Sequence, residues 1–143
     1  GVKDIKNVHP AEIDNNYLWH NGIIKMDCVR KLQNDLETDE AWDTKLLLQM
    51  LMEFGIPNDI NGTFAGIWIR PPYRANYTQN RIFVFRNEIS PLFMDKDMNI
   101  SSTKFSNSYS INANVMYKIK LKDKYIIDSD VFSTVENPYY GVL

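Results

Sequence analysis

The sequence predicts an α+β fold in which an N-terminal helical hairpin packs on a mainly antiparallel β-sheet. Apolar residues recur every three to four positions through much of residues 1–59, whereas they alternate in several segments after Asn61. The first spacing is typical of amphipathic helices and the second of strands. Helices that precede strands, rather than alternate with them, favour the α+β class.

Charge changes sign along the same division of the chain. Residues 1–59 hold six Lys or Arg against eleven Asp or Glu, whereas residues 60–127 hold ten against four. A chain of 143 residues has the usual size of one domain. We therefore expect a single domain over residues 1–143, with an acidic helical part (1–59), a basic β-rich part (60–135) and a C-terminal tail (136–143).

The acidic part is expected to contain three helical segments. Pro10 is a favourable first residue for a helix that runs to about Trp19 and ends at the Asn21-Gly22 turn signal. A second helix is predicted by apolar residues that lie four positions apart, at Ile24, Cys28, Leu32 and Leu36.

The third helix is expected to begin after a cap at Thr38 or Asp39 and to run to Phe54. Gly55 suits the left-handed conformation that ends a helix, and Pro57 prevents continuation. Because only a short polar link separates the second helix from the third, the two together predict the helical hairpin.

In the basic part, two strands are expected on either side of a long loop. Phe64–Ile69 and Ile82–Phe85 have apolar residues on both alternating faces, which is typical of strands that are covered on both sides. The segment between them contains two prolines and is too long for a tight turn, so residues 70–81 are expected to project as a loop.

Further strands are expected toward the C-terminus. Ile111–Leu121 alternates apolar with polar residues, which predicts one core face and one wet face in an antiparallel sheet. Asp95–Ser110 is polar and is expected to be irregular, whereas Tyr125–Ile127 and Val131–Val135 predict two short strands.

The 70–81 loop and its borders concentrate arginine and tyrosine, since four of the five arginines lie between positions 70 and 86. Arginine presents a planar fork to carboxylates or phosphates, and tyrosine provides a large contact area. Both are enriched at interface hot spots, although an exposed loop without a partner is the plain alternative. The residues expected to bind a protein partner, in the loop and the tail, are Arg70, Tyr73, Arg74, Tyr77, Arg81, Tyr139 and Tyr140.

A stripe of lysines on the last long strand suggests an alternative function. Alternate lysines can follow phosphate groups, or they can cover a solvated sheet face and discourage edge pairing. The alternative is therefore a nucleic-acid-binding module, with Tyr73 or Tyr77 stacking on bases. Its expected contact residues are Arg70, Arg74, Arg81, Lys118, Lys120 and Lys122. Because Arg81 and Arg86 lie on opposite faces of a regular strand, the four arginines cannot form one patch.

No catalytic signature occurs in the sequence: it has no Walker loop, dinucleotide-binding glycine pattern or nucleophile elbow. Asp95, Asp97 and Asn99 copy the first positions of a calcium loop, but Ile100 stands where the turn glycine belongs, so a polar turn is expected. Cys28 lies on an apolar stripe, which favours a buried thiol. We expect no cofactor, metal or enzymatic activity, with a small enzyme built on a carboxylate pair as a second alternative.

Targeting signals are also missing from the sequence, because no apolar run spans a membrane and the N-terminus carries no apolar secretory segment. Frequent Asn, Ile, Lys and Tyr indicate an AT-rich coding sequence, which phages, viruses and many bacteria share. The expected function is a non-enzymatic interaction protein, a homo- or hetero-oligomeric subunit of a larger assembly such as a virus or phage particle. Its expected location is the cytoplasm or such a particle.

Overall fold

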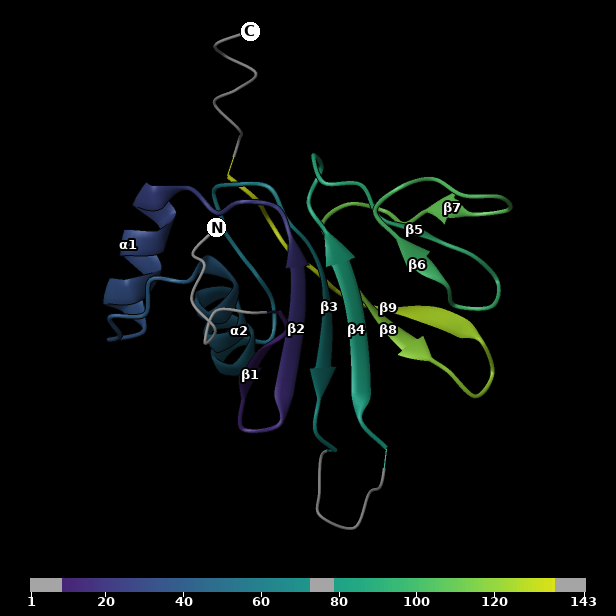
Figure 1. Ribbon diagram of the computed structural model, residues 1–143, viewed down its shortest axis with the longest axis horizontal. Helices are drawn as coiled ribbons and strands as arrows, with labels where there is room; N and C mark the ends of the chain where they lie inside the picture. Colours follow the sequence, from purple (N-terminus) through teal and green to yellow (C-terminus); the bar gives the residue numbers. More distant parts are fainter. Residues whose placement is uncertain (1–8, 73–78, 136–143) are drawn as a thin grey trace, which may run out of the picture.

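The computed structural model describes residues 9–72 and 79–135 and confirms the α+β class, with mainly antiparallel sheets and two helices in these residues (Figure 1). The larger sheet has the strand order β1-β2-β3-β4-β8-β9, and each neighbouring pair is antiparallel. Its strands are β1 (Ala11–Ile13), β2 (Asn16–Asn21), β3 (Ala65–Arg70), β4 (Arg81–Arg86), β8 (Val115–Lys120) and β9 (Tyr125–Val131). The smaller sheet, in the order β6-β5-β7, consists of β5 (Phe93–Met94), β6 (Ile100–Ser101) and β7 (Tyr109–Ser110).

The predicted helix over residues 10–19 is wrong, because this segment forms the β1–β2 hairpin. Between the two strands, Asp14 and Asn15 adopt φ angles of 50° and 64°, the left-handed conformation of a two-residue hairpin turn. Leu18 then pairs with Trp68 of β3, and both side chains are fully buried. The helices therefore follow two strands and do not form the N-terminal hairpin that the sequence predicts.

Both remaining helices occur where the apolar spacing places them, as α1 (Met26–Asp35) and α2 (Asp43–Phe54). The predicted C-terminal cap of α2 is confirmed: Gly55 has φ 82° and donates its N–H to the Leu51 carbonyl at 2.8 Å. The predicted cap at Thr38 or Asp39 is wrong, because the helix begins only after Trp42. Thr38 instead uses its hydroxyl to accept the Glu40 N–H within the link.

The larger sheet has a hydrophobic core on each face. On one face, hereafter the helix face, the strands pack against α1 and α2 through residues such as Leu18, Trp68, Phe83, Phe85 and Met116. On the opposite face, Val84, Tyr117 and Ile119 pack in one cluster with Met94 of the smaller sheet and with Leu92 and Ile111, which lie next to that sheet in the sequence. The strands β3 and β4 are thus covered on both sides, as the sequence predicts.

Two predictions for the C-terminal half need correction. Residues 95–110 are not wholly irregular, because they supply two strands of the smaller sheet. The predicted wet face of β8 is partly core, since Met116 is 1% exposed and packs with the helix-face cluster. The second error arises because the packing on each face of β8 depends on the order of the strands and on the smaller sheet, which alternation along one strand cannot show.

Candidate interaction surface

Four basic side chains meet on the helix face of three neighbouring strands. Arg70 of β3 is paired directly with Arg81 of β4, and Phe83 of β4 is paired with Lys118 of β8. The same register, in which Ile82 faces Ile119, brings Lys120 beside Arg81. Because side chains alternate between faces, these four lie on the face of Trp68 and Phe83. We call Arg70, Arg81, Lys118 and Lys120 the cationic face.

The two arginines of the cationic face are positioned by the core beneath them. The Arg70 guanidinium carbon lies 4.4 Å from the ring centroid of Trp68, within the range of a cation–π contact. Trp68 is fully buried, and its indole Nε1–H donates to Asn16 Oδ1 at 3.1 Å. Arg81 donates its Nε–H to the Pro71 carbonyl at 3.1 Å, which braces the base of the 70–81 loop. Arg70, Arg81 and Lys118 each have further interactions within the chain.

Like charges that face each other across strands repel, so the surface that these four side chains form is complementary to an anion. The four side chains are half-buried, which weakens solvent screening of their mutual repulsion. Next to them, Tyr125 and Ile127 of β9 pair with Lys120 and Lys118, and these two side chains are 47% and 43% exposed. Positive charge beside exposed apolar area is the composition of a binding surface for an acidic partner.

The other residues singled out in the sequence divide into two groups. Tyr73, Arg74, Tyr77, Tyr139 and Tyr140 lie outside the described residues, so the structure leaves their predicted role in partner binding untested. Lys122 follows β8 as an exposed turn residue, beyond the end of the cationic face.

Arg86 lies apart from the cationic face, as the prediction of opposite strand faces requires. Its guanidinium donates to the carbonyl of Ile111 at 2.7 Å, to the carbonyl of Asn87 at 3.1 Å and to Ser110 Oγ at 3.3 Å. Arg86 of β4 is therefore hydrogen-bonded to the end of β7 in the smaller sheet and to the residue that follows it.

Sequence reasoning missed Tyr125 and Ile127, because they lie on a strand whose only visible feature was its apolar content. Nothing along the chain indicates that they stand beside Lys118 and Lys120; that depends on the pairing of β8 with β9. The chain turns over residues 121–124, and the register that follows from this turn fixes which residues of β8 and β9 face each other.

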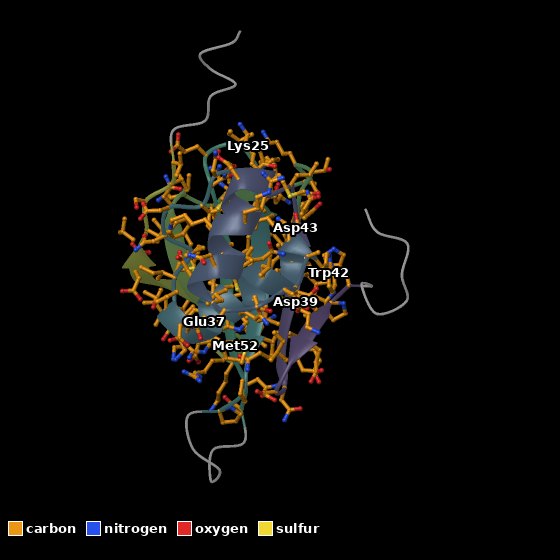
Figure 2. All side chains as sticks on the ribbon, turned by 90° about the vertical axis from the view of Figure 1, so that its left-hand side faces the viewer. Lys25, Glu37, Asp39, Trp42, Asp43 and Met52 are labelled. Carbon is orange, nitrogen blue, oxygen red and sulfur yellow. The ribbon has the colours of Figure 1, made fainter. Side chains whose placement is uncertain are left out.

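An acidic segment complements the cationic face elsewhere on the molecule. The end of α1, the link and the start of α2 carry five carboxylates in nine positions: Asp35, Glu37, Asp39, Glu40 and Asp43. Figure 2 views the molecule from the side of the two helices, and the labelled Glu37, Asp39 and Asp43 lie on this side. Two of the five are neutralised locally, by Lys31–Asp35 at 3.3 Å and Lys45–Glu40 at 3.7 Å. The opposed charges of the sequence thus become separate surfaces of one fold.

A cavity of about 400 Å³ between α1, α2 and residues 56–60 is lined by Cys28 and by the carboxylates of Asp35 and Asp59. These groups already have structural partners. Burial raises the pKa of the Cys28 thiol, which disfavours the thiolate needed for nucleophilic chemistry. Asp35 pairs with Lys31, and Asp59 Oδ1 accepts the Ser133 hydroxyl at 2.8 Å. Nothing about this cavity favours catalysis over packing.

The calcium-like segment forms a hydrogen-bonded turn. Asp95 Oδ1 accepts the backbone N–H groups of Asp97 and Asn99, at 3.0 and 2.9 Å, and Asp95 Oδ2 accepts the Asn99 side-chain amide at 3.0 Å. These bonds lower the pKa of Asp95, with the Asn99 side chain as the largest cause. Across residues 9–72 and 79–135, no three His, Cys, Asp or Glu side chains gather closely enough to hold a metal ion.

His20 of β2 is buried between the larger sheet and α2. It is 8% exposed, its Nδ1 lies 3.1 Å from Thr44 Oγ1, and its Nε2 lies 3.5 Å from the Thr63 carbonyl oxygen. The carbonyl can only accept, so Nε2 carries the proton and Nδ1 accepts the Thr44 hydroxyl. Burial lowers the pKa of His20, although the nearby Asp43 carboxylate opposes this effect.

His20 predicts that the protein loses stability in mild acid. The unfolded chain binds a proton at His20 below about pH 6.5, whereas the folded chain resists it, so the free energy of unfolding falls as pH drops below that value. Below the lowered pKa of the folded state, this contribution becomes constant. Urea unfolding at pH 7.5 and pH 5.5 measures the effect, with His20→Gln as the matched variant. An equal pH dependence in both proteins would contradict this role of His20.

In the described part of the chain, no helix is both long and apolar enough to cross a lipid bilayer. The comparisons with known proteins supply no relative: no family model matches the chain, and neither a curated protein nor a solved structure matches it.

Proposed function

We propose that this protein is a non-enzymatic subunit of a larger assembly, and that its cationic face docks on an acidic protein surface. The observation that supports the proposal best is the direct pairing of Arg70 with Arg81. Lys120 lies beside this pair, and exposed apolar residues lie on the adjacent strand β9. Carboxylates on a partner's surface would complement this row of positive charge.

A second copy of the chain offers a suitable acidic surface. The segment from Asp35 to Asp43 carries five carboxylates, and the cationic face belongs to different elements of the same fold. Contact between two different surfaces of identical subunits is heterologous, and it produces closed rings or open filaments. Together with the AT-rich coding bias, this geometry supports a particle component, such as a virus or phage subunit, as the kind of assembly.

Nucleic-acid binding is the alternative, and the same row of cations favours it. Its main difficulty lies on the adjacent strand, because β9 carries Asp128 and Asp130 and no Lys or Arg. On the face of Lys118 and Lys120, this strand presents Tyr125, Ile127 and Asp130, so a phosphate backbone that crossed the cationic face toward β9 would meet two apolar side chains and a carboxylate. An acidic protein patch of limited size avoids them, so the protein partner is the better supported of the two.

The charge of the cationic face is expected to control self-association. Replacement of both β8 lysines, Lys118→Glu with Lys120→Glu, should weaken association about tenfold or more at low salt, because two attractive charges become repulsive. The matched control is Lys96→Glu with Lys104→Glu, which makes the same change of charge on two exposed residues of the smaller-sheet loops. Size-exclusion chromatography with light scattering measures the association constant of each protein.

Salt and oligonucleotides separate the two functions in the same experiment. Assembly through the cationic face is supported if an oligomer forms at low salt, dissociates at high salt and keeps the same mass when oligonucleotides are added. A monomer that shifts only with a mixed-sequence oligonucleotide, and returns at high salt, supports nucleic-acid binding instead. Equal association of the double variant and its control would contradict the role of the cationic face.

A further inference from the structure

Strand β9 is a long, exposed edge of the larger sheet. Among the described residues it pairs only with β8, and the opposite edge of the sheet is the three-residue strand β1. Figure 1 draws β9 at the side of the sheet away from the helices. Alternate residues of such a strand direct their backbone N–H and C=O groups outward, where a further strand can pair with them.

The side chains of β9 are unusual for a strand that only faces water. Six of its seven residues are exposed, and these include Tyr125 at 47%, Ile127 at 43% and Val131 at 76%. Exposed carboxylates accompany the apolar residues, at Asp128 and Asp130. An incoming strand would therefore find apolar area and negative charge on the same seven residues.

We propose that β9 accepts an extended segment of a partner protein as a seventh strand, and that in this segment Lys or Arg alternates with apolar residues. The apolar residues of the segment cover Tyr125 and Ile127 on the helix face. Its cations face the other way, toward Asp128, because side chains alternate along both strands. Backbone hydrogen bonds supply affinity in this mode of recognition, and the side chains supply specificity.

A second copy of the chain is a poor occupant of this edge. Antiparallel pairing of two β9 strands brings the Asp128 and Asp130 carboxylates of one copy close to those of the other. The exposed residues of β1 and its turn include Glu12 and Asp14, so the opposite edge of another copy is acidic as well. Nucleic acid is excluded by the same charges, which leaves a cationic polypeptide.

The bulge in the β8–β9 ladder limits where a further strand can pair with β9. Tyr117 pairs with Asp128 and Met116 with Asp130, so Ser129 is the additional residue on β9. Bulges and charged edge residues discourage indiscriminate pairing of edge strands. The regular part, Tyr125–Asp128, remains available to a strand whose charge matches.

The experiment measures fluorescence anisotropy of a labelled nine-residue peptide in which five Lys alternate with four Val. We expect saturable binding of this peptide, and none of a peptide in which Glu replaces every Lys. A third peptide has the Lys–Val sequence but alternates L- and D-residues; it keeps the charge and composition without forming a regular strand. It should bind at least about tenfold more weakly.

The matched protein variant is Asp128→Asn with Asp130→Asn, which keeps the size of both side chains and the whole backbone. We expect it to weaken binding of the Lys–Val peptide about threefold, the effect of the exposed charge pair at Asp128. In the unaltered protein, the peptide should also slow hydrogen exchange of β9 amides. This second measurement requires no variant, so it stands even if the double variant folds poorly.

Four results would overturn the proposal. Equal binding of the L/D peptide would show that no strand is added. Unchanged affinity in the Asp128→Asn/Asp130→Asn protein, or unchanged exchange of the β9 amides, would place the peptide elsewhere. A change of oligomeric state in that variant would identify a second copy as the occupant. The Lys118→Glu/Lys120→Glu protein keeps both aspartates, so loss of self-association in that protein and loss of peptide binding in the Asp128→Asn/Asp130→Asn protein are separate results.

Discussion

Replacement of Trp68 by alanine is expected to lower the free energy of unfolding by about 3–5 kcal/mol, the usual cost of truncating a fully buried tryptophan. Trp68 is 0% exposed and packs on Phe83, with ring centroids 5.5 Å apart. Its loss also leaves Asn16 Oδ1 without the indole donor in a buried position. Chemical denaturation followed by circular dichroism gives the free energy directly.

Trp19 offers a matched control on the neighbouring strand. It is 40% exposed and pairs with Ile67, one position from the Leu18–Trp68 pair, with its side chain on the other face. Trp19→Ala should therefore cost less than about 1.5 kcal/mol, because much of the ring is already in water. Similar losses in the two variants would show that the larger sheet does not have its main core on the helix face.

The Trp68→Ala protein should also be impaired at the cationic face. The indole ring supports the Arg70 guanidinium at 4.4 Å, so its removal frees the arginine to move away from Arg81. We expect weaker self-association than in the Trp19→Ala protein, provided that both are measured where they remain folded. This links the packing of the core to the proposed function.

Gly62→Ala is expected to destabilise the protein by about 3 kcal/mol or more, because two separate costs add. The φ angle of Gly62 is +153°, a conformation that residues with a side chain rarely adopt. In addition, a Cβ atom at this position would lie 2.8 Å from the Ile24 Cα and still closer to the Ile23 carbonyl oxygen. Backbone atoms cannot move aside as a flexible side chain can.

The tight contact at Gly62 continues the pairing of β2 with β3. Gly62 faces Ile24 in an isolated bridge, the Thr63 N–H donates to the Ile23 carbonyl, and the Lys25 N–H donates to the Asn61 carbonyl, both at 2.9 Å. A side chain at Gly62 would therefore separate the strand that enters α1 from the strand that enters β3. We expect a lower thermal midpoint and faster hydrogen exchange in both segments.

Gly55→Ala is the control for Gly62→Ala. Gly55 also has a left-handed φ, of 82°, but a Cβ there would meet nothing within 4 Å. Only the conformational cost remains, about 1 kcal/mol. If the two alanine variants were equally stable, the close backbone approach at Gly62 would have no energetic consequence.

The secondary structure was predictable where one periodicity was sustained. The stripe through Cys28 and Leu32 fits a helix and no strand, so α1 was found, and Gly55 marked the end of α2 correctly. Residues 10–19 contain too few apolar positions to distinguish the two periods. Their strand conformation depends on Leu18 packing against Trp68, fifty positions away, which no local pattern contains.

The candidate site was predictable only in part. The positions of Arg70 and Arg81 at the two ends of a loop indicate that they approach each other, and the register confirms this proximity. Whether Lys118 and Lys120 join them depends on β8 pairing with β4 rather than with another strand. The opposite placement of Arg86 was predictable, because the alternation of strand side chains is a local property.

The α+β class, the two helices, the occurrence of β3 and β4 and the separation of acidic from basic residues could be predicted from the sequence. These are properties of short segments, and they depend on bond geometry and on which side chains avoid water. The order of the strands, the cover on both faces of β8, the cationic face and the exposed edge at β9 became visible only in the folded chain. Each of these depends on contacts between segments far apart in the chain, because a strand's hydrogen-bond partners are not encoded in its own residues.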